Sequence, residues 1–136
     1  MIGVVVVTHG QLATELVNGA EAIVGDLPQF AAVSIGWHED TLDAREEIAQ
    51  AIARVKQDQG VLILTDMFGG TPSNLALTFL AEGAVEVVTG VNLPMLIKLA
   101  GVTAQADLLA AAREMREDGR NAIWVASDLL RGDKAT

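Results

Sequence analysis

The chain has 136 residues, enough for one domain with its own core and too few for two. Its formal net charge of −9 argues against a nucleic-acid partner, and the lack of cysteine excludes disulfides and thiol chemistry. The longest apolar runs are far shorter than the roughly 20 residues of a membrane-spanning helix, so we expect no membrane insertion. The start of the chain does not resemble a signal peptide, and we expect a cytoplasmic protein.

Predicted strands and helices alternate along the chain. Apolar runs predict strands at residues 2–8, 30–35, 60–65 and 85–89. Helices are predicted at residues 11–23, 41–56, 72–80, 95–100 and 103–117, and a last short strand at residues 122–126. This order predicts a three-layer α/β fold, with a mainly parallel four-stranded sheet of flavodoxin-like winding and helices on both faces. We expect residues 1–127 to form the single domain and residues 128–136 a short polar tail.

Residues 66–74 (Asp-Met-Phe-Gly-Gly-Thr-Pro-Ser-Asn) follow a buried strand and have the pattern of a tight turn that opens a helix. Gly69 and Gly70 allow positive φ or close approach of the backbone to a ligand. Pro72 suits the first helical position, with Thr71 as the expected capping residue. A new helix directs unpaired N–H groups at this turn, so the pattern predicts an anion there.

His9 ends the first predicted strand as Asp66 ends the third, and the two side chains can meet if these strands are neighbours. Asp66 would then accept the Nδ1 proton and leave a lone pair on Nε2. The glycine turn and the Thr71 hydroxyl would supply donors to an anion on that nitrogen. The motifs contain no lysine or arginine, no nucleotide-binding loop and no set of carboxylates for a divalent metal, so we expect no cofactor or metal. A histidine that accepts and releases a phosphoryl group fits this pattern.

Three motifs closely resemble those of mannose-type enzyme IIA, the phosphocarrier of the bacterial phosphoenolpyruvate-dependent sugar phosphotransferase system: Thr8-His9-Gly10, residues 66–74 and residues 90–95. They occur in the order and at the spacing of that family. The resemblance implies that His9 takes a phosphoryl group from the small carrier HPr and passes it to a IIB protein for sugar uptake and phosphorylation. Asp66 would orient His9. Phe68 stands at the family's bulky aromatic position and Thr71 at its Ser/Thr position.

The family fold also implies a homodimer that exchanges an antiparallel C-terminal strand, here residues 122–126. Trp124 lies in that run, which would otherwise leave an exposed sheet edge. Only ten residues, 127–136, follow the run, so we expect transfer to a separate IIB protein.

Met67, Phe68 and, more weakly, Trp37 are the expected partner-docking residues. His38 lies in the same loop as Trp37 and is either a second ligand or a solvated side chain, the second reading being favoured.

Three alternatives remain open at this point. One is a phosphohistidine protein that regulates without a transport partner. Another is the phosphocarrier of dihydroxyacetone kinase, although that relative usually has a Gly-Ser-Ala type of turn where this chain has Gly69-Gly70-Thr71-Pro72. The third is a flavodoxin-like ligand-binding protein without phosphoryl chemistry.

Overall fold

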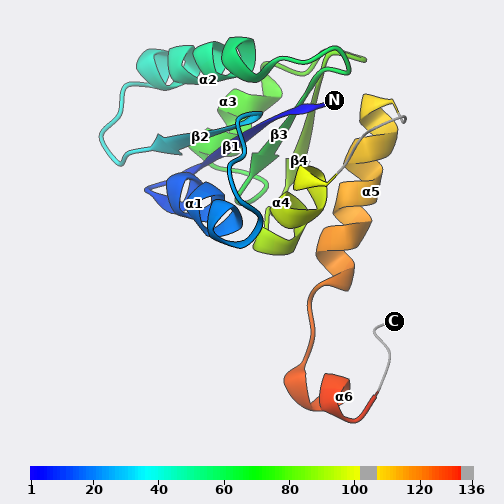
Figure 1. Ribbon diagram of the computed structural model, residues 1–136. Helices are drawn as coiled ribbons and strands as arrows, with labels where there is room; N and C mark the ends of the chain where they lie inside the picture. The colour runs from blue at the N-terminus through cyan, green and yellow to red at the C-terminus, as the bar shows by residue number, and fades with distance from the viewer. Residues whose placement is uncertain (102–106, 133–136) are drawn as a thin grey trace.

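A four-stranded parallel sheet forms the middle of the molecule in the computed structural model, which describes residues 1–101 and 107–132 (Figure 1). The strand order is β2-β1-β3-β4. The strands are β1 (Gly3–His9), β2 (Phe30–Ile35), β3 (Val61–Thr65) and β4 (Val85–Thr89). Because β2 and β3 flank β1 on opposite sides, the winding direction reverses at β1, as in flavodoxin-like sheets. The predicted fold class is confirmed.

Alternate residues of β1 pack into two separate cores. Val4 and Val6 belong to the cluster on one face of the sheet, and Val5 and Val7 belong to the cluster on the other. All four valines are almost completely buried. Successive side chains of a strand point to opposite faces, so a continuous apolar run is what a strand covered on both faces requires.

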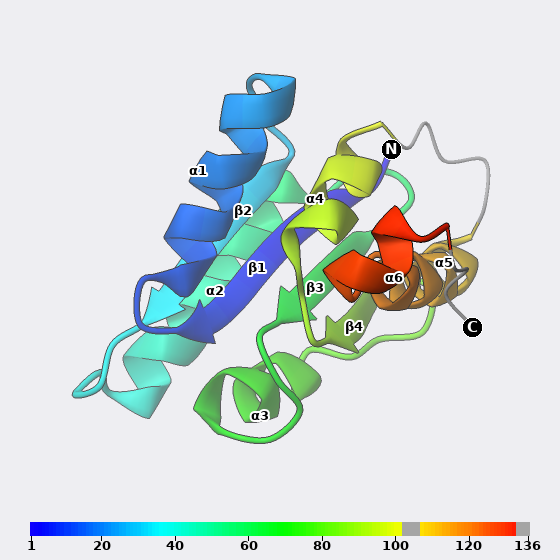
Figure 2. The same ribbon diagram turned by 90° about the horizontal axis from the view of Figure 1, so that it is seen from below.

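Helices cover both faces of the sheet, and Figure 2 shows α1 and α4 in front of it with α2 behind. The first face carries α1 (Leu12–Val24), α4 (Leu93–Ala100) and α5 (Leu108–Asn121). The second carries α2 (Thr41–Val55) and α3 (Thr71–Leu77). Within the described residues, no helix is long and apolar enough to cross a membrane.

Several helix boundaries differ from those expected. The helix α3 ends at Leu77 and not at residue 80, and α4 begins at Leu93, two residues before its expected start. The helix α3 begins at Thr71, with Gly70 as the residue before it and without a capping side chain. Thr71 is therefore a helical residue and not the cap, because the positive φ of Gly70 (+85°) already ends the turn. The helix α5 begins at Leu108 and runs on to Asn121, while residues 103–106 of the helix expected there lie outside the described residues.

The strand expected at residues 122–126 is wrong for the single chain. Residues 122–125 form neither helix nor strand, and Ala126 begins the short helix α6 (Ala126–Leu130). Figure 1 shows α6 at the end of an extended stretch that leaves the sheet after α5. A strand needs the backbone hydrogen bonds of a neighbouring strand, and this segment pairs with no strand in the part of the chain that the structure describes. The helix also crosses the expected domain boundary after residue 127.

Candidate functional site

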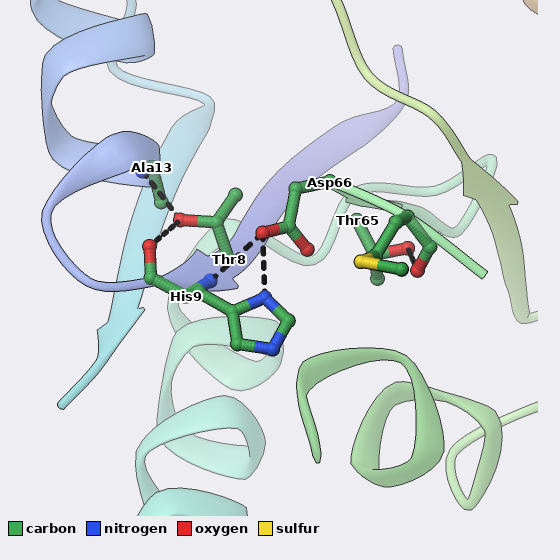
Figure 3. Close-up of polar contacts among 6 residues, drawn as sticks. Thr8, His9, Ala13, Thr65 and Asp66 are labelled. Atoms are coloured by element: carbon green, nitrogen blue, oxygen red, sulfur yellow. Dashed lines mark hydrogen bonds and ion pairs between the residues drawn. The ribbon is translucent and has the colours of Figure 1, made fainter. Parts of the chain in front are cut away.

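His9 and Asp66 meet at the carboxyl edge of the sheet. Parallel pairing of β1 with β3 aligns Val7 with Thr65, so His9 and Asp66 extend from the ends of neighbouring strands. The His9 Nδ1 lies 2.8 Å from the Asp66 Oδ2, and the backbone N–H of His9 donates to the same oxygen at 3.1 Å (Figure 3). The expected contact is thus present. The second bond fixes the carboxylate to the backbone as well as to the ring.

The contact between His9 and Asp66 determines which ring nitrogen is free. The Asp66 side chain is 14% exposed and the His9 side chain 52% exposed. Burial alone would raise the pKa of Asp66, but the hydrogen bonds from the His9 ring and backbone, with the attraction of the ring, hold that pKa below its ordinary value. An ionised carboxylate only accepts, so the Nδ1 carries a proton, and the Nε2 is the nitrogen that has the lone pair in the neutral form of the ring.

The glycine turn passes along the free edge of the His9 ring. A Cβ placed on Gly70 would lie 3.1 Å from both the Cε1 and the Nε2 of His9. Gly69 and Gly70 have φ values of +93° and +85°, in the region that side chains disfavour. Thr71 follows on the exposed rim. Any residue with a side chain at position 70 would crowd the nitrogen that Asp66 leaves free.

Thr8 fixes the backbone on the other side of His9, a role that the sequence analysis did not assign. Its hydroxyl is buried, accepts the Ala13 N–H at 2.6 Å and donates to the His9 carbonyl at 3.2 Å. It thereby ties the end of β1 to the first turn of α1. A polar residue at the end of an otherwise apolar strand, directly before the histidine, was the available signal.

A cleft of about 480 Å³ opens beside His9. Three segments line it, and they lie at or after the carboxyl ends of the neighbouring strands β1, β2 and β3. They are His9 and Gly10; Ile35, Gly36, Trp37, Glu39 and Thr41; and Gly70 and Thr71. Glu39 and Thr41 were not among the predicted site residues, because their place in the cleft depends on β2 lying next to β1. Among residues 1–101 and 107–132, no group of three or more His, Asp or Glu side chains is placed to hold a metal ion.

The three expected docking residues are all exposed. Trp37 is 92% exposed and also lines the cleft, whereas Met67 and Phe68 lie in the turn that follows Asp66. His38 is exposed too, with its ring edge-on to Trp37 at 6.2 Å between centroids, and it does not line the cleft. Its position fits a loop side chain more than a second ligand.

The motif at residues 90–95 follows β4 and begins next to the residue that precedes Asp66. The N–H groups of Gly90 and Val91 donate to the Thr65 carbonyl at 2.8 and 2.9 Å. Asn92 accepts the Met95 N–H at 3.2 Å and donates to the Gly119 carbonyl at 3.0 Å. It therefore caps α4 and ties it to α5. Neither Asn92 nor Met95 lines the His9 cleft, and the contacts of Asn92 fix the segment that follows β4 against α5.

Comparisons with known proteins show the family of this chain. The family model described as "PTS system fructose IIA component" (EIIA-man) matches residues 3–116. The chain belongs to this family. The resemblance to mannose-type enzyme IIA is thereby confirmed, and the chain is a IIA component of the mannose, fructose and sorbose group of phosphotransferase-system proteins.

The chain is also similar to individual proteins of the phosphotransferase system. It is 29% identical over 131 residues to the fructose-specific EIIA component of Bacillus subtilis strain 168, covering 96% of this chain and 90% of that protein. It is 32% identical over 98 residues to the mannose-specific EIIAB component of Escherichia coli K12, covering 71% of this chain but only 30% of that longer protein. The crystal structure of a Streptococcus pneumoniae IIA protein associated with a fucose utilization operon matches with a TM-score of 0.82 at 26% identity, covering 94% of this chain and 95% of that one.

Proposed function

We propose that this IIA protein is a phosphocarrier that accepts a phosphoryl group on His9 from an HPr-like protein and passes it to a IIB protein for sugar uptake and phosphorylation. One observation carries the proposal. The Nδ1 of His9 is held by Asp66 at 2.8 Å, while the Nε2 lies beside Gly70 at the open cleft. A histidine in this state is an oriented nucleophile.

The transfer forms one bond and breaks one bond in each direction. The Nε2 lone pair of His9 attacks phosphorus, and the P–N bond of the donor breaks with its electron pair returning to the donor nitrogen. The His9 ring becomes positive while the Nδ1 keeps its proton, and the Asp66 carboxylate stabilises that charge. Attack by the acceptor then breaks the P–Nε2 bond, and the pair returns to His9.

Gly69, Gly70 and Thr71 are the proposed phosphoryl-binding residues. Gly70 leaves the space beside the Nε2 free, since a Cβ there would lie only 3.1 Å from that nitrogen. Gly69 allows the preceding turn, and the Thr71 hydroxyl lies on the same rim, where it can donate to a phosphoryl oxygen.

Met67, Phe68 and Trp37 are the proposed docking residues for the donor and the acceptor, which would meet the protein in the cytoplasm. All three are large, apolar and exposed around the edge that carries His9. His9 is the only proposed phosphoryl acceptor, and it lies at one edge of the sheet. The HPr-like donor and the IIB protein would therefore bind this edge in turn.

A homodimer is the second part of the proposal. Five large apolar residues after α5 are exposed: Ile123, Trp124, Val125, Leu129 and Leu130. The strand β4 pairs only with β3 among the described strands, so its outer edge offers backbone donors and acceptors. A groove beside it is lined by four consecutive β4 residues, 86–89, together with α5. Residues 122–126 of a second copy could add a strand there and bury the apolar side chains.

A phosphorylation assay tests the proposal. The protein is mixed with enzyme I, HPr and phosphoenolpyruvate, and the phosphorylated residue is mapped under conditions that preserve phosphohistidine. We expect one acid-labile phosphate on His9 and none on His9→Ala, with His38→Ala labelled like the unaltered protein. Phosphate on His38, or full labelling of His9→Ala, would contradict the assignment.

A further inference from the structure

Glu39 brings a negative charge into the cleft that the phosphoryl group would enter. It is the one carboxylate among the nine described residues lining that cleft, and none of the nine is lysine or arginine. Strand order places its loop on the β2 side of His9, and the Gly70–Thr71 turn on the β3 side. A group attached to the Nε2 therefore lies between neutral donors on one side and a carboxylate-bearing loop on the other.

The Glu39 side chain is held in place without a cation. Its Oε1 accepts the Gly36 N–H at 3.3 Å, and its own N–H donates to the Gly36 carbonyl at 3.2 Å. Its Oε2 is buried and has no hydrogen-bond donor among the described residues. Among the described residues, Glu39 forms no ion pair with a lysine or an arginine.

The neighbouring Glu47 supports this description. A hydrogen bond with Glu39, then burial, then repulsion by Glu39 and Asp43 raise the pKa of Glu47. The carboxylate of Glu39 therefore makes Glu47 easier to protonate than an isolated glutamate. Glu39 lines the cleft, whereas Glu47 is not among the cleft residues.

We propose that the Glu39 carboxylate sets the phosphoryl-transfer potential of His9, by raising the free energy of the phosphorylated form. This inference rests on the proposed function. Like charges in a partly enclosed cleft repel, so a carboxylate near a phosphoryl group favours its departure. Asp66 has the opposite effect, because it contacts the ring at the Nδ1 and stabilises the positive imidazole. The pair of carboxylates lets His9 accept the group and still give it up.

Spontaneous hydrolysis measures this effect without a partner protein. The P–Nε2 bond breaks and its electron pair returns to the Nε2, the water oxygen bonds to phosphorus, and both water protons leave with the phosphate. The same repulsion acts on the equilibrium with HPr, which compares phospho-His9 with the phosphorylated donor.

The test compares Glu39→Gln with Glu46→Gln. Glutamine keeps an oxygen that can accept the Gly36 N–H, so the loop is retained while the charge is removed. Glu46 is exposed on α2, does not line the cleft, and gives the same change in net charge. For Glu39→Gln we expect a phospho-His9 half-life and an equilibrium occupancy against HPr roughly three- to tenfold higher. Glu46→Gln and the charge-conserving Glu39→Asp should stay within about twofold of the unaltered protein.

The possible outcomes distinguish the role of Glu39 from the phosphocarrier function. A half-life and an occupancy of Glu39→Gln that match Glu46→Gln, or that fall, would overturn the role of Glu39 while leaving the phosphocarrier function intact. Lack of label on His9 in the unaltered protein would instead overturn the phosphocarrier function itself. Thermal melting of each variant checks the fold, and Glu39→Ala provides a second neutral variant if Glu39→Gln melts early.

Discussion

The carboxyl edge of the sheet and the segment after α5 differ in where their contacts come from. At the edge, His9 is held by Asp66 and Thr8 supports its backbone, all within one chain. Beyond α5, Trp124 and its neighbours Ile123 and Val125 are exposed and belong to neither helix nor strand. The first region is complete in the single chain. The segment after α5 has the apolar composition of a buried strand or helix, but its side chains are exposed in the single chain.

Asp66→Asn gives the largest effect that we expect at the edge. Asparagine keeps the shape but removes the charge that holds the Nδ1 proton and stabilises the positive ring. We expect phosphorylation of His9 by HPr to slow by roughly 10²-fold or more with the fold intact. Quench-flow labelling measures the rate, and circular dichroism checks the fold.

The matched control for Asp66→Asn is Asp26→Asn. Asp26 is exposed and precedes β2, so it lies toward the opposite edge of the sheet. It makes the same change of charge far from His9, and its rate should equal that of the unaltered protein. If Asp66→Asn also reacted at the normal rate, Asp66 would be a turn residue only.

Trp124→Glu tests the region after α5. If residues 122–126 pair with β4 of a second copy, a charge at this apolar position should weaken the dimer at least tenfold. Sedimentation equilibrium measures the dissociation constant. Ile23→Glu is the control, since Ile23 is a large apolar residue on α1 that is also exposed. A chain that ends after Ala122, which keeps α5 and the bond between Asn92 and Gly119, should behave like Trp124→Glu.

The same truncation also tests whether the segment after α5 forms the dimer interface at all. A truncated chain that remains dimeric and melts normally would show that residues 123–136 do not form the interface. The exposed apolar residues would then need another explanation, and the family's strand exchange would not extend to this chain.

The parts of the fold that follow from local pattern were predicted correctly. The strands β2 and β4 have the predicted limits, because a short, mainly apolar run between polar turns needs little tertiary information. The contact of His9 with Asp66 followed from the parallel order of the strands that end at these residues. Thr71 was misplaced by one position, since the conformation of Gly70 decides where α3 begins.

The features that the sequence did not predict depend on which strands lie next to each other. Residues 122–126 have a strand composition, but β-propensity reflects packing against neighbouring strands, and no strand of the described ranges pairs with them. Glu39 and Thr41 reach the cleft only because β2 lies beside β1. Nothing in their local sequence distinguishes them from the solvated start of a helix.

Phe68→Ala gives the smallest expected effect of these three variants. It tests whether Phe68 contacts the partner proteins at the edge that carries His9. Phe68 follows Asp66 closely in the chain, yet it is 74% exposed and does not line the cleft. A side chain that touches neither the ring nor the phosphoryl space can contribute only when a partner covers it. We therefore expect transfer from HPr to slow by roughly tenfold, the usual cost of losing one apolar contact at an interface. Hydrolysis of phospho-His9, which needs no partner, should be unchanged.

The two rates together separate docking from chemistry. Ile23→Ala removes an exposed apolar side chain from α1 and should alter neither rate. If Phe68→Ala changed transfer and hydrolysis equally, Phe68 would act on the phosphoryl group or on the turn that carries Gly69 and Gly70. If it slowed transfer from HPr but not transfer to the IIB acceptor, the two partners would contact different sides of His9. Slowing of both transfers, with constant hydrolysis, is the result expected of one shared edge.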